Sequence, residues 1–136
     1  MTQEDKQLLL QDLCARLPYG VKVLDNSHKN YGVSKLINIG LDGSMLIDNE
    51  INDIQYYPII DDVKPYLRPM SSMTEEESDE FQQLDTECDK MPTFDYVSIE
   101  HYRIFDWLNA HHFDYRGLIE RGLAIAVTED NNPYKS

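Results

Sequence analysis

The feature that most constrains the fold is a series of short apolar runs between residues 21 and 60, each ended by turn-forming residues. Asp42-Gly43 lies between two of these runs, Val33-Ser-Lys-Leu-Ile-Asn-Ile39 and Ser44-Met-Leu-Ile47. Because glycine accepts the positive φ that a tight hairpin turn requires, this arrangement indicates a β-hairpin. Four or five closely spaced short strands predict a small antiparallel meander, which forms either a curled sheet or a partly open barrel.

Three segments outside this region show helical spacing of their apolar residues. Thr2 is a good N-cap for a first helix over residues 3–17, whose leucines recur on one stripe. Thr74-Glu-Glu-Glu77 has the form of a capping box and predicts a second helix over about residues 75–90. A third helix is expected over about residues 98–111.

Two further segments are less regular. Asp114 can cap a short fourth helix that ends near Gly122. The segment 59–70 contains Pro65 and Pro69, and each proline disfavours helical geometry at the residue before it. We therefore expect an ordered connector there.

These elements predict an α+β fold: an N-terminal helix, a small antiparallel β-meander or partly open SH3-like barrel, and then C-terminal helices. The 136 residues are enough for one domain with its own core. We expect this domain to span residues 1–128, with a β-rich part at about 20–60 and a helical part at about 74–124. Residues 129–136 are expected to form a flexible tail.

The net charge of −13 is unevenly distributed. Residues 1–68 hold seven Lys and Arg against ten Asp and Glu, whereas residues 69–136 hold five against fifteen. Such a field repels duplex DNA and anionic membrane surfaces, and it favours a basic partner. The same acidity also serves solubility alone, without any role in recognition.

The sequence also predicts a location. There is no run of about 18 apolar residues, and the amino terminus is acidic and polar where a targeting segment would be basic and then apolar. Cys14 and Cys88 lie on predicted helices, so we expect both thiols to be reduced and buried. Together these features predict a soluble cytoplasmic protein.

No motif for catalysis or for cofactor binding is recognisable in the sequence, which favours a protein that is not an enzyme and needs no cofactor. The pair His111-His112 is the nearest approach to a metal site. Adjacent residues on a helix point about 100° apart and cannot readily share one ion, so we expect a structural role for this pair.

Three stretches of the chain carry a resemblance. They are Leu8-Leu-Leu-Gln-Asp-Leu-Cys-Ala-Arg-Leu-Pro-Tyr-Gly20, Val63-Lys-Pro-Tyr-Leu-Arg-Pro-Met-Ser-Ser-Met-Thr-Glu-Glu-Glu77 and Phe105-Asp-Trp-Leu-Asn-Ala-His-His-Phe-Asp-Tyr-Arg-Gly-Leu-Ile-Glu-Arg-Gly-Leu-Ala124. In them the chain resembles an uncharacterised family of small phage- and prophage-associated proteins of gut bacteria. The resemblance implies a phage-related setting and a cytoplasmic protein, and it transfers no activity and no catalytic residue.

Two classes of function fit these features. The first is a non-enzymatic interaction module that binds a host or phage protein, such as a basic nucleic-acid-binding protein, through an acidic helix, an aromatic C-terminal patch or both. Its expected partner-binding residues are Glu75, Glu76, Asp79, Glu80, Trp107, His112, Tyr115 and Arg116. The aromatic residues among them are equally typical of a buried core.

The second class is a protein that binds single-stranded nucleic acid through a locally positive β-edge between Lys22 and Lys35. His28, Lys29 and Tyr31 lie between these two lysines. The sequence leaves the oligomeric state open.

Overall fold

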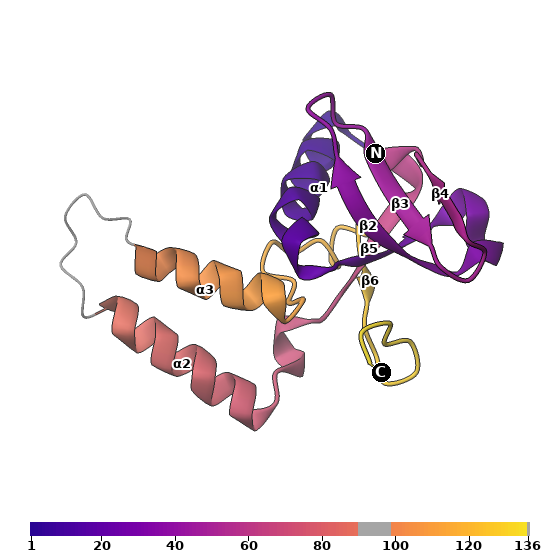
Figure 1. Cartoon of the computed structure of the whole chain (residues 1–136). Coiled ribbons are helices and arrows are strands. Elements are labelled where there is room, and N and C mark those ends of the chain that lie inside the picture. Colours follow the sequence, from indigo (N-terminus) through magenta and orange to yellow (C-terminus); the bar gives the residue numbers. More distant parts are fainter. Residues whose placement is uncertain (90–98, 136) are drawn as a thin grey trace.

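The computed structural model describes residues 1–89 and 99–135, which form an α+β fold (Figure 1). Helix α1, Gln3–Arg16, is followed by five strands, by the helices α2 (Glu75–Asp89) and α3 (Ile99–Ala110), and by a sixth strand. Short 3₁₀ helices connect these elements: η1 (Leu17–Tyr19), η2 (Asn26–Tyr31), η3 (Ile60–Asp62) and η4 (Met70–Ser72). The predicted fold class is confirmed.

The strands form one open sheet in the order β4-β3-β2-β1-β5-β6. They are β1 (Lys22–Asp25), β2 (Val33–Ile39), β3 (Met45–Asn49), β4 (Ile54–Tyr56), β5 (Val63–Leu67) and β6 (Ile125–Ala126). Strands β1 to β4 pair antiparallel with their neighbours in the chain, which confirms the meander. Gly43 has a φ of 82° in the turn between β2 and β3, as the Asp-Gly pair predicts.

Helix α1 covers one face of this sheet (Figure 1). Leu9 and Leu13 pack there against strand residues such as Val23 and Ile47, and all four side chains are fully buried. Cys14 points away from the sheet and is exposed, so the expectation that its thiol is buried was wrong. The side chain of Cys88 lies outside the described residues.

Strand β5 replaces the connector that was expected over residues 59–70. It lies between β1, with which it pairs antiparallel, and β6, with which it pairs in parallel. The backbone carbonyl of Leu67 faces β6, where it accepts a hydrogen bond from the Val127 N–H. Backbone groups two residues apart in a strand point to the same side, so the backbone nitrogen of Pro65 also faces β6. Its nitrogen is therefore turned away from β1, and no ladder hydrogen bond to β1 is lost. The β-rich part accordingly extends beyond residue 60.

Helices α2 and α3 form a hairpin that projects away from the sheet (Figure 1). Helix α2 begins where the sequence predicted, and its capping box is formed. The Glu77 N–H donates to Thr74 Oγ1 at 3.2 Å, and the Thr74 N–H donates to Glu77 Oε1 at 3.0 Å. At the same end of the hairpin, Leu108 and Asn109 of α3 are buried against the rest of the molecule.

The predicted fourth helix is absent, since residues 114–124 form turns. Asp114 does act as a cap, because its two carboxylate oxygens accept hydrogen bonds from the N–H groups of Leu118 and Ile119, each at 2.9 Å. No helix continues from this cap, because Gly117 has a φ of 76° and Gly122 a φ of 74°, and both values interrupt helical geometry.

Candidate functional site

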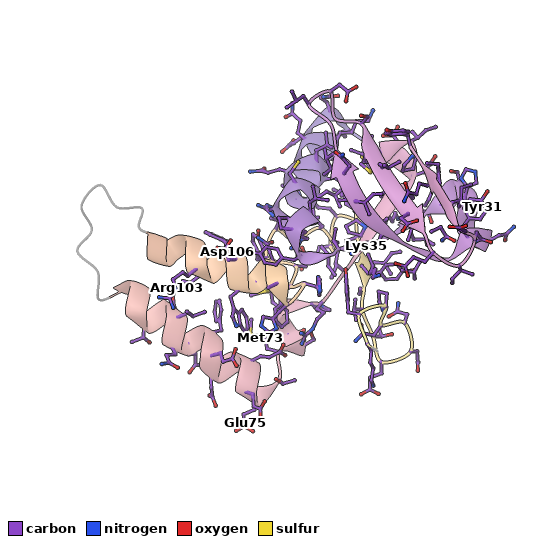
Figure 2. All side chains as sticks on the ribbon, viewed as in Figure 1. Tyr31, Lys35, Met73, Glu75, Arg103 and Asp106 are labelled. Carbon is purple, nitrogen blue, oxygen red and sulfur yellow. The ribbon has the colours of Figure 1, made fainter. Side chains whose placement is uncertain are left out.

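The outward face of α2 carries a row of carboxylates. Glu75, Glu76, Asp79 and Glu80 are all exposed, and Figure 2 shows Glu75 pointing away from the rest of the molecule. Within the part of the chain that the structure describes, none of these four carboxylates forms an ion pair. Like charges one helical turn apart destabilise a helix slightly, so this surface is electrostatically uncompensated.

Glu77 differs from its neighbours because it turns inward and fixes the base of the hairpin. Arg68, just beyond β5, donates from Nη1 to Glu77 Oε2 at 2.7 Å and from Nη2 to Oε1 at 2.6 Å. The Arg68 hydrogen bonds, helped by the N–H of Thr74, lower the pKa of Glu77 to about 2. The guanidinium also lies 4.1 Å above the Phe113 ring. This contact connects α2 to the sheet and to the chain after α3.

Trp107 joins the two helices of the hairpin. Its Nε1–H donates to Glu80 Oε2 at 3.0 Å, so one of the predicted acidic residues contacts one of the predicted aromatic residues. Its ring packs against Phe81 of α2, His111 and Phe113, with centroid separations of 5.8, 4.3 and 5.7 Å. A shallow depression of about 260 Å³ lies beside it, lined by Glu80, Gln83, Leu84, Arg103 and Trp107.

The other predicted aromatic residues do not join this surface. His112 stacks on Tyr134, with ring centroids 3.6 Å apart. Burial, reinforced by the positive charges of Arg16 and Arg68, lowers the pKa of His112 to about 4. The Tyr134 hydroxyl accepts from the Lys22 N–H at 3.0 Å and donates to the Tyr66 carbonyl at 2.7 Å, so it bridges β1 and β5. Tyr134, which lies within the segment 129–136 predicted to be a flexible tail, is thus attached to the sheet.

Tyr115 and Arg116 belong to a buried ionic network beneath α1. Arg16 and Asp12 are both fully buried and pair at 2.8 Å. Arg116 donates to the second Asp12 oxygen at 2.8 Å and to the Tyr115 hydroxyl at 2.8 Å. Arg16 also donates to the Phe113 carbonyl at 2.6 Å. The network connects α1 to the loop after α3. The sequence pattern of α1 showed only its leucine stripe and did not reveal this network.

A second polar cluster surrounds Asp25 at the end of β1. Its carboxylate is buried and accepts hydrogen bonds from Tyr56, Ser27 and His28. Burial opposes ionisation, but these hydrogen bonds outweigh it and lower the pKa of Asp25. Ser27 Oγ and Asp25 Oδ2 both meet the same nitrogen of His28, Nδ1, at 3.1 and 3.0 Å. In a catalytic triad the serine hydroxyl and the carboxylate contact opposite ring nitrogens of the histidine, so this cluster is not a triad. Its hydrogen bonds instead stabilise the turn after β1.

The side chains of His111 and His112 contact different parts of the molecule. His111 lies on Trp107 and 3.4 Å from Glu77, whereas His112 turns to Tyr134. Over residues 1–89 and 99–135, no three His, Cys, Asp or Glu side chains converge as they would around a metal ion. The same residues include no helix of the length and apolarity needed to cross a bilayer.

The lysines of the second hypothesis do not lie on an edge of the sheet. Lys22 and Lys35 face each other across β1 and β2, which are inner strands. The prediction of a β-edge was therefore wrong. Tyr31 is half-buried and stacks with His28 at 5.0 Å, so it does not extend the lysine surface.

Comparisons of the chain with protein-family models, with curated proteins and with solved structures find no match.

Proposed function

We propose that this chain is a non-enzymatic interaction module whose projecting hairpin binds a basic protein surface. The observation that carries the proposal is the exposed carboxylate row on α2, which has no ion pair within the described residues and lies on the hairpin that projects from the sheet (Figure 1). A partner with Lys and Arg side chains would relieve the repulsion between these carboxylates.

The spacing of the charges indicates the class of partner. The pairs Glu75/Asp79 and Glu76/Glu80 each place two charges one turn apart, which is about 6 Å along the helix axis. A regular row of negative charges resembles a nucleic-acid backbone, so a basic nucleic-acid-binding protein fits best. Trp107 supplies an aromatic anchor beside the row, a residue type enriched where binding energy concentrates. The resemblance to phage and prophage proteins would make the partner a host or phage protein.

The hairpin is rigid enough to present this surface. Arg68 holds Glu77 through two hydrogen bonds, and Trp107 donates across to α2. Binding therefore needs little ordering of the helix that carries the charges, which lowers its entropic cost.

The test uses a labelled deca-arginine peptide as a model of a basic partner, with binding followed by fluorescence anisotropy. The variant E75Q/E76Q/D79N removes three charges from α2, and we expect its affinity to fall about tenfold, since exposed ion pairs contribute about 0.2–1 kcal/mol each. The matched control E4Q/E120Q/E129Q removes three exposed charges elsewhere. Equal weakening by both variants would show that only net charge matters and would refute the hairpin as the binding site.

A further inference from the structure

Among residues 1–89 and 99–135, no helix lies on the face of the sheet opposite α1 (Figure 1). Side chains alternate along each strand, and the buried residues Val23, Leu36 and Ile47 mark the face that α1 covers. The intervening positions, Lys22 and Lys35, therefore lie on the uncovered face. So does Lys64, which pairs with Leu24 across β1 and β5.

None of these three lysines forms an ion pair with another described residue. Of the lysines the structure describes, only Lys6 forms an ion pair, with Asp61 at 3.4 Å. Lys22 and Lys35 are directly opposite each other in the register, and like charges in that position destabilise a sheet, although Lys35 is also opposite Asp48 on β3. A bound polyanion would remove this repulsion.

We propose that this uncovered face binds single-stranded nucleic acid, with Lys22, Lys35 and Lys64 contacting the phosphates. This site is distinct from the acidic hairpin. The groove on this face measures about 200 Å³; its lining includes Lys22, Lys35, Asp48, Glu50 and Pro133. This volume is below the roughly 300 Å³ and more of pockets that enclose small ligands. The groove is therefore better suited to part of a nucleic-acid strand that lies across the sheet than to an enclosed small molecule.

Tyr57 supplies an aromatic ring for the same surface. It follows Tyr56, whose hydroxyl reaches the buried Asp25, so alternation turns Tyr57 toward the uncovered face. Its side chain is 69% exposed. Two strand spacings, about 10 Å, separate β4 from β2, and Tyr57 lies two residues beyond Gln55, which is level with Lys35. The two residues are therefore about 12 Å apart, so a base stacked on Tyr57 would leave the neighbouring phosphates within reach of Lys35.

The net charge of −13 does not prevent this binding. Most of the excess acid lies in residues 69–136, and the carboxylate row of α2 is on a hairpin that points away from the sheet (Figure 1). At physiological ionic strength the Debye length is about 8 Å, so remote charges are largely screened while the lysines act at contact distance. Asp48 and Glu50 line the groove itself, so their charges reduce the expected affinity.

A flexible single strand fits better than a duplex or an acidic protein. Over the residues that the structure describes, no helix or ribbon projects from this face to enter a duplex groove. A single strand can place bases on Tyr57 while its phosphates reach the lysines, whereas an acidic helix has nothing to stack.

The test measures anisotropy of labelled 12-nucleotide oligothymidylate and oligouridylate between 50 and 200 mM NaCl. Three phosphate contacts predict a slope of log affinity against log salt of about −2, and K22Q/K35Q should reduce its size by about 1.4. K6Q/R121Q removes the same charge on the α1 side, where Arg121 pairs with Asp5, and should leave the slope unchanged. Y57A should weaken binding about tenfold at constant slope.

Several results would overturn the proposal: no binding at 50 mM salt with 100 μM protein, equal loss in K22Q/K35Q and K6Q/R121Q, or equally good competition by a polyglutamate peptide. Thermal unfolding of each variant confirms that it is folded. The hairpin variant E75Q/E76Q/D79N should retain oligonucleotide binding, so failure of this proposal and failure of the hairpin proposal are distinguishable.

Discussion

Replacing Glu77 by Gln should destabilise the protein, because it removes the charge that Arg68 holds at the base of the hairpin. The pKa of Glu77 falls from 4.5 to about 2 on folding. At 1.36 kcal/mol per pKa unit this sets an upper limit of about 3.4 kcal/mol. Both side chains keep some contact with water, with exposed fractions of 20% for Arg68 and 15% for Glu77. We therefore expect E77Q to lose about 1–2 kcal/mol at pH 7.

The pH dependence distinguishes the ion pair from the cap. Because folding lowers the pKa of Glu77, its ionic contribution is complete well above pH 4.5 and is lost as pH falls through about 2. The difference between wild type and E77Q should shrink by more than half by pH 3.

Urea unfolding followed by the fluorescence of Trp107, the only tryptophan, measures this difference. The matched control E76Q changes an exposed neighbour and should stay within about 0.5 kcal/mol of wild type. A destabilisation by E77Q that is equally large at pH 7 and pH 3 would refute the reasoning, since it would show that charge is not the cause.

Two further predictions concern the contacts that join distant parts of the chain. Y134F should cost about 1–3 kcal/mol in urea unfolding, because the Lys22 N–H and the Tyr66 carbonyl both lose their partner, whereas Y57F on an exposed ring should change little. D12A should lower the free energy of unfolding by about 3–5 kcal/mol, because it leaves the fully buried Arg16 without its carboxylate partner. D5A breaks the exposed pair with Arg121 and should lower the free energy of unfolding by less than about 1 kcal/mol. If D12A and D5A lowered the free energy of unfolding by similar amounts, burial would not explain the stability that the Asp12–Arg16 pair contributes.

The structure brings together five of the eight residues that the sequence analysis grouped as partner-binding. The carboxylate row of α2 and Trp107 lie side by side, joined by the hydrogen bond from Trp107 to Glu80. The row itself could be predicted because a capping box and a helical period are local patterns. His112, Tyr115 and Arg116 were grouped with them because they are near in sequence and of interface-rich types. Their partners, Tyr134 and Asp12, are far away along the chain, and no local pattern identifies them.

The sequence by itself determined the elements whose stability comes from nearby residues: α1, the α2 cap, α3 and the β1 to β4 meander. Caps, periodicity and an Asp-Gly turn act over a few residues, so their consequences can be read without knowledge of the rest of the chain. Tertiary structure alone decided that the segment around Pro65 becomes a strand between β1 and β6. It also decided that Asp12 and Arg16 are buried together and that, among the described residues, α1 covers only one face of the sheet. These outcomes depend on burial and pairing between residues many positions apart, which are settled only when the whole chain has packed.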